Sequence, residues 1–155
     1  MLETIARFFA ELHFQYTEQF LTALLPMAVT VVIHGEGMGL ASRYLRRFGA
    51  PAAGRSHRAS GVVVLIAIVA IMLATHFAEV AAWAIFYLAT DMLPDFRTAM
   101  FYSVNSYTTL GASNIELPGQ WRGLGGFEAI AGMLMFGWST AILVAVVQKT
   151  HNIEA

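Results

Sequence analysis

The chain has no cysteine and carries little charge. Asp, Glu, Lys and Arg together make up 12% of its 155 residues, whereas 57% of the residues are hydrophobic. Without cysteine, the chain forms neither disulfides nor thiolate metal sites. So small a charged share beside so large an apolar one is unusual for a soluble domain. We therefore predict a membrane protein.

Motifs of nucleotide-binding proteins are also missing. Gly35 and Gly39 lie on an apolar run with no strand before them, unlike the glycines of a dinucleotide fingerprint. Their spacing instead favours close packing of one helix on another. The long apolar runs leave no room for a soluble catalytic domain. We predict no nucleotide and no nucleic acid as partners, and we place the function in or beside the bilayer.

Three apolar runs are long enough to cross a bilayer as helices. Residues 61–88 and 125–147 both exceed the roughly 20 residues that a crossing needs. Residues 20–41 form a weaker candidate because the run ends with His34 and Glu36. We predict an all-α membrane protein with three transmembrane helices.

The first residues have a different pattern. Apolar side chains in residues 2–12 recur at helical spacing opposite charged ones, which is typical of a helix lying at the membrane interface. We divide the chain into this amphipathic helix (1–18), a first transmembrane helix with a basic loop (19–59), and a larger domain (60–155).

Basic residues predict the orientation. The connection between the first two runs holds five arginines, and Lys149 follows the third run. Loops rich in arginine and lysine stay in the cytoplasm. We therefore expect the N-terminus outside and the C-terminus in the cytoplasm of a cell (inner) membrane protein, with membrane lipid in contact with the basic loop. The arginines are Arg43, Arg46, Arg47, Arg55 and Arg58.

The connection between the second and third runs is too apolar for a surface loop and too short for a crossing. Pro94 suits the first position of a helix, and Asp95 through Tyr107 would form one about 20 Å long. Such a helix enters a membrane without crossing it. Non-helical backbone at that depth is tolerated where it lines an aqueous path. We predict a re-entrant helix followed by a loop that lines a pore.

The residues of this connection resemble a known family. Residues 101–122, FYSVNSYTTLGASNIELPGQWR, contain an aromatic pair, a Ser-Val, a Thr-Thr-Leu-Gly core and a later Trp-Arg. In this order they resemble the pore helix and selectivity filter of the potassium-channel superfamily, and the resemblance extends from the second run onward. It implies a homo-tetramer around a central pore, in which backbone carbonyls and threonine hydroxyls bind monovalent cations. The filter residues implied are Thr108, Thr109, Leu110, Gly111, Ala112 and Ser113.

The outer half of the implied filter departs from the family pattern. The family reads Thr-hydrophobe-Gly-Tyr-Gly-Asp, whereas this chain reads Thr-Leu-Gly-Ala-Ser-Asn. Ala112 replaces the tyrosine that braces the filter, which leaves the supporting Phe101 and Tyr102 without that partner. Asn105 and Asn114 stand where many relatives carry an acid pair. We expect cation conduction with weakened K⁺ selectivity, K⁺ and also Na⁺ as permeant ions, and no cofactor.

Two further groups of residues fit a channel. Asp91, Asp95 and Glu116 would lie near the outer mouth, where acids attract cations. Gly132 and Gly137 are weak points of the last helix and suit a gating hinge, with close helix packing as an equal alternative.

Five ionisable residues fall within the predicted spans, where they are costly unless paired. At 1.5 Å per residue, His34 lies about 22 Å below the outer surface and His76 about 24 Å above the inner one. We therefore expect different depths and no metal site beyond the permeant cation. Hydrogen bonding between helices is the favoured role, and proton or metal sensing the alternative. The five are His34, Glu36, His76, Glu79 and Glu128.

The leading functional hypothesis is thus a passive cation channel, not an enzyme, with no catalytic residues. A non-conducting regulatory or assembly subunit that keeps the pore-loop fold is the alternative. An intramembrane hydrolase is weaker still, because the chain has no His-Glu-x-x-His motif and no nucleophile elbow.

Overall fold

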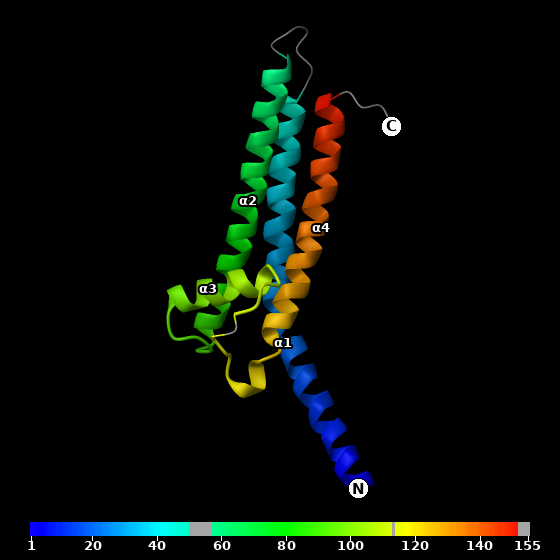
Figure 1. The fold of residues 1–155 in the computed structure, drawn as a ribbon, viewed down its shortest axis with the longest axis vertical. Helices are drawn as coiled ribbons and strands as arrows, with labels where there is room; N and C mark the ends of the chain where they lie inside the picture. Colours follow the sequence, from blue (N-terminus) through cyan, green and yellow to red (C-terminus); the bar gives the residue numbers. More distant parts are fainter. Residues whose placement is uncertain (50–56, 113, 152–155) are drawn as a thin grey trace. The chain divides into compact units, whose positions relative to one another are not determined.

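The computed structural model describes residues 1–49, 57–112 and 114–151. This part of the chain forms four α-helices and one short 3₁₀ turn, and no strand occurs in it. Figure 1 shows these elements along the chain. The elements are α1 (Leu2–Phe48), α2 (His57–Ala89), α3 (Phe96–Tyr107), η1 (Gly119–Trp121) and α4 (Leu124–His151).

The three predicted spans are confirmed as three helices that are long and apolar enough to cross a bilayer. Their qualifying stretches are Tyr16–Phe48, Gly61–Ala89 and Gly119–Gln148. Large apolar side chains along them are exposed, Val32, Val63 and Ile66 among them. Such exposure suits hydrocarbon rather than water as the surrounding medium.

Helix α1 is longer than the sequence indicated. It continues without a break across residue 18, where the amphipathic segment was predicted to end, and through Pro26. Residues 43–47 belong to its last turns rather than to a loop, so Arg46 and Arg47 lie at a helix C-terminus. Cations there interact favourably with the helix dipole. The interfacial position of residues 1–18 stays a prediction, and Arg55 lies outside the described residues.

The helices contribute to two compact units. The first unit comprises residues 1–30 and 80–133 and so contains α3 and both of its connections. Its large buried side chains are aromatic, with Trp83, Tyr87 and Tyr107 almost fully covered. The indole N–H of Trp83 donates to the Thr30 hydroxyl at 3.0 Å. This hydrogen bond joins α1 to α2 within the unit.

The second unit comprises residues 31–79 and 134–155. Segments of α1, α2 and α4 run side by side in it (Figure 1). A close approach occurs at Gly37, where an added Cβ would lie 2.1 Å from the Thr75 hydroxyl oxygen. Glycine therefore lets α1 approach α2 closely. The buried apolar core of this unit is formed by Met38, Ala41, Val64, Ile68, Met72 and Val146.

Candidate functional site

Helix α3 begins with a capped N-terminus. Asp95 is the N-cap, and its side chain accepts a hydrogen bond from the backbone N–H of Thr98 at 2.9 Å. Pro94 therefore lies one residue before the cap and two residues before the first helical residue. The prediction that it is the first residue of the helix was wrong. The Thr98 N–H lowers the pKa of the Asp95 carboxyl, which keeps this exposed group charged. The sequence predicted the helix itself almost to the residue.

A buried carboxylate fastens α3 to its neighbours in the first unit. Glu128, at the start of α4, is fully buried and accepts hydrogen bonds from the hydroxyls of Tyr87 (2.8 Å) and Ser103. The Ser103 oxygen also lies 2.9 Å from the Val80 carbonyl oxygen. One side chain of α4 thus binds both α2 and α3, and the predicted role of Glu128 in helix pairing gains a specific pair of partners.

The two residues predicted to support the filter have different surroundings. Tyr102 is buried and makes an edge contact with Tyr87, with ring centroids 5.3 Å apart. Phe101 is exposed. Tyr102 therefore has an aromatic partner on α2. Phe101 offers an apolar surface for a contact beyond this single chain.

The loop after α3 has an unusual backbone. Thr109 has φ 62° and Gly111 has φ 81°, and a positive φ is costly for a β-branched residue but free of Cβ strain for glycine. The amides of Thr109 and Gly111 donate to the carbonyls of Ser106 and Asn105, both at 2.9 Å. These bonds hold the loop against the C-terminus of α3. Strained backbone of this kind is common at functional sites.

The predicted filter residues are open to the surroundings in the single chain. Thr108, Thr109 and Gly111 are exposed, and Leu110 is 77% exposed. Ala112 is half-buried. Ser113 lies outside the described residues.

The two asparagines have unequal environments. Asn105 is buried, and its side-chain amide donates to the Phe101 carbonyl of its own helix at 2.7 Å. Asn114 is exposed. The Asn105 side chain therefore stabilises the last turns of α3. The Asn105 carbonyl in this region accepts the hydrogen bond from the Gly111 N–H.

The predicted mouth acids lie on the connections of the first unit. Asp91 lies in the turn after α2 with φ 53°, and Asp95 caps α3. Glu116 forms an exposed ion pair with Arg122 at 2.5 Å, so its charge is partly offset. Two of the three predicted acids thus precede the first residue of α3.

Comparison with known proteins agrees with this arrangement. A profile described as ion channel matches residues 63–149, more than half of the chain. The chain belongs to the ion channel family. The resemblance to potassium channels that the sequence indicated is thereby confirmed, and the ion channel is a multi-pass membrane protein. No curated protein and no solved structure matches the chain. Helix α1 lies outside the matched residues.

The two glycines of α4 differ in their surroundings. A Cβ at Gly132 would lie 2.1 Å from the Tyr107 carbonyl oxygen, whereas a Cβ at Gly137 would meet nothing within 4 Å. Helix α4 of the ion channel is continuous through both positions. Gly132 therefore has the close-packing role that the sequence offered as an alternative, and the hinge stays a prediction.

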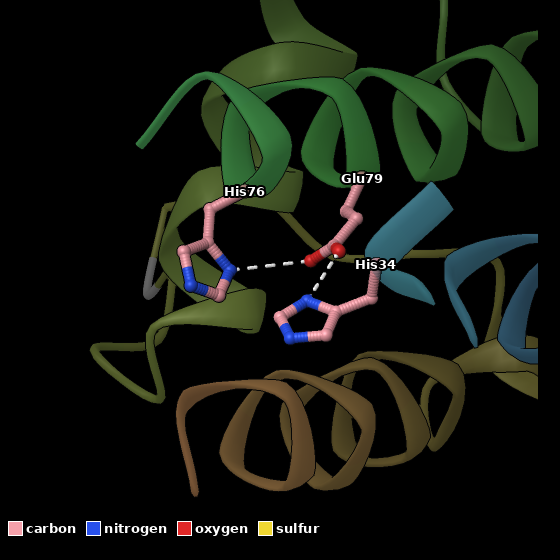
Figure 2. Close-up of side chains that lie close together, drawn as sticks. All are labelled: His34, His76 and Glu79. Atoms are coloured by element: carbon pink, nitrogen blue, oxygen red, sulfur yellow. Dashed lines mark hydrogen bonds and ion pairs between the residues drawn. The ribbon is translucent and has the colours of Figure 1, made fainter. Parts of the chain in front are cut away.

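The histidines contradict the depth estimate. In the second unit His34 Nδ1 lies 2.8 Å from Glu79 Oε1, and His76 Nδ1 lies 3.2 Å from Glu79 Oε2 (Figure 2). The expectation that His34 and His76 lie at different depths was wrong. Hydropathy locates the ends of a span poorly, whereas the contact at Gly37 sets the register of α1 on α2. Glu36, the remaining ionisable residue, lines a groove between α1 and α2.

Proposed function

We propose that this ion channel family member is one subunit of a homo-tetrameric channel that conducts monovalent cations passively. The observation that carries the proposal is the loop of residues 108–112. It is neither helix nor strand, residues 108–111 are exposed, and it lies between two membrane-spanning helices of a family match. Backbone of this kind is compatible with the membrane where it lines a water-filled path.

Helix α3 supports the re-entrant part of the proposal. Its 12 residues span about 18 Å, less than the roughly 30 Å of a bilayer core. The helix enters the membrane from the side of Asp95 and stops inside it. Its C-terminal carbonyl end then faces the pore cavity and favours a cation there.

The exposure of Leu110 and Phe101 supports assembly. Both are large apolar side chains, 77% and 49% exposed in the single chain, and both belong to the α3–loop region. One loop supplies only part of a coordination cage, so four copies around an axis complete it and cover these side chains. Coordination comes from the carbonyls of Thr109 to Ala112 and from the Thr109 hydroxyl.

The proposed channel lies in the cell (inner) membrane, with its N-terminus outside and its C-terminus in the cytoplasm. The arginines at the end of α1 support this orientation. It also places Asp91 and Asp95 at the outer mouth. No chemical step is assigned to the protein, and we propose no cofactor other than the permeant K⁺ or Na⁺.

Thr109→Ala is expected to change cation flux about tenfold, because a ring of four hydroxyl ligands is lost and about 1.4 kcal/mol of ion binding with it. The measurement is Tl⁺ or K⁺ flux into liposomes that contain the purified protein. Thr90→Ala is the matched control, since its hydroxyl bonds back to the Phe86 carbonyl of its own helix. A Thr109 variant that conducts like the wild type would contradict the proposed filter.

Weak K⁺ selectivity is expected of the wild-type channel. The replaced outer filter lacks the aromatic brace, so the carbonyl cage is less able to hold the spacing that K⁺ prefers. Reversal potentials in opposed K⁺ and Na⁺ gradients give the permeability ratio, and we expect less than about tenfold discrimination, or 1.4 kcal/mol. A ratio as high as that of a strongly selective channel would contradict this expectation. A stable tetramer without any flux would instead support a non-conducting subunit.

A further inference from the structure

A buried polar cluster in the second unit has no role in the proposed pore. It consists of His34 from α1, His76 and Glu79 from α2, and Ser139 from α4. His34 and Glu79 are fully buried. Figure 2 shows the Glu79 carboxylate between the two imidazole rings, with a dashed line to each. Three helices thus meet at one group of side chains.

The hydrogen bonds of the cluster are compatible with an ion between the rings. A neutral imidazole carries one N–H. When both Nδ1 atoms donate to Glu79, both Nε2 atoms are acceptors. They lie 3.0 Å (His76) and 3.5 Å (His34) from the Ser139 oxygen. With Nδ1 bound to a metal ion, each ring keeps its hydrogen on Nε2, and the two lone pairs of Ser139 accept both.

The ligand types fit a divalent transition metal. Two imidazole nitrogens and one carboxylate form a set that suits Zn²⁺ and its neighbours, whereas Mg²⁺ and Ca²⁺ prefer oxygen ligands. Their potential ligand atoms lie within 4.8 Å of one another. In a tetrahedral zinc site, ligand atoms about 2.0–2.1 Å from the ion are roughly 3.3 Å apart. Each imidazole contacts a different oxygen of Glu79, at 2.8 Å for His34 and 3.2 Å for His76, and both distances are close to that spacing.

The surroundings hold the rings in place. The His34 ring packs against Trp138 with centroids 5.1 Å apart, and the His76 ring packs against Phe136 at 4.6 Å. The two histidine rings are themselves 5.4 Å apart. Aromatic neighbours from α4 therefore limit the rotation of both imidazoles, and limited rotation preorganises a metal site.

We propose that His34, His76 and Glu79 bind one divalent transition-metal ion per chain through His34 Nδ1, His76 Nδ1 and a Glu79 oxygen. The two ring hydrogens move from Nδ1 to Nε2 and donate to Ser139, so the number of protons is unchanged. The ion joins α1, which lies outside the family match, to α2, which lies mostly within it. Metal binding does not depend on ion conduction, so this proposal can be tested independently of the channel function.

The test is Zn²⁺ binding by the purified full chain in detergent, stripped with a chelator and followed by calorimetry. We expect one Zn²⁺ per chain in the wild type. His34→Gln, His76→Gln and Glu79→Gln should each weaken binding more than about 100-fold, and Ser139→Ala about tenfold, because outer partners contribute 10- to 100-fold.

Two variants are matched controls. His13→Gln removes another histidine of α1, and Glu36→Gln removes a carboxylate two residues from His34 that lines a separate groove. Both should bind Zn²⁺ like the wild type. The proposal is overturned if the wild type shows no saturable binding, if the cluster variants keep full affinity, or if a control variant loses it.

A second measurement covers the case of a variant that does not fold. X-ray absorption at the zinc edge of the wild-type protein should show two imidazole ligands and oxygen at about 2.0–2.2 Å. A shell with no imidazole, or with four, would contradict the proposed ligand set.

Discussion

Gly132→Ala should reduce cation flux at least tenfold. The new Cβ would lie 2.1 Å from the Tyr107 carbonyl oxygen, whereas real Cβ atoms stay beyond 3.0 Å of such atoms. Tyr107 is the last residue of α3, directly before the loop. The backbone must therefore shift by about 1 Å at the entrance to the proposed filter, beyond the roughly 0.5 Å that a functional site tolerates.

Gly137→Ala provides the comparison for this prediction. Both substitutions add one methyl group to a glycine of α4, but nothing lies within 4 Å of the Cβ at Gly137. Close packing therefore predicts loss of flux for the Gly132 variant alone. Equal effects of both variants on flux would favour a hinge in α4 instead. Flux into liposomes, normalised to the amount of protein reconstituted, separates the two results.

Glu128→Ala should lower the free energy of unfolding by about 2–4 kcal/mol, because the buried hydroxyls of Tyr87 and Ser103 both lose their acceptor. Glu128→Gln should retain most of the stability. The amide oxygen accepts from one hydroxyl, and the amide nitrogen donates to the other, since a hydroxyl also accepts. Reversible unfolding in mixed micelles measures the difference.

Glu116→Ala is the control for a carboxylate in an exposed setting. Its ion pair with Arg122 is open to solvent on both sides, and such pairs contribute little to stability. We expect an unfolding midpoint like that of the wild type. If the Glu128 variant also unfolded like the wild type, the idea that this residue fastens α3 to α2 and α4 would be wrong.

Much of the fold could be predicted from the sequence because its signals are local. The span at residues 61–88 is long and almost free of charge, and the structure has a membrane-spanning stretch there, Gly61–Ala89. The end of α3 at Tyr107 was also predicted correctly from the sequence. The first helix was harder to delimit because charged residues persist in it to Arg47, and a helix can include such residues once the apolar stretch is over.

The side-chain partners could not be predicted, because they depend on the relative register of helices. His34 is 45 residues from Glu79, and Glu128 is 25 residues from Ser103. Hydropathy marks such residues as unusual but does not identify their partners. One signal was present for the contact of α1 with α2: Gly37 lies three residues after His34, and Thr75 lies next to His76. A small residue near a polar one on each helix is a sign of a close and polar helix contact.

Helix α1 supplies hydrogen-bonding partners to two buried side chains of α2. Thr30 is hydrogen-bonded to Trp83 in one unit, and His34 is hydrogen-bonded to Glu79 in the other. A shortened protein that kept only the region shared with the family would turn an indole N–H and an acid toward hydrocarbon. Helix α1 therefore satisfies buried polar groups of α2, although it lies outside the region that matches the family.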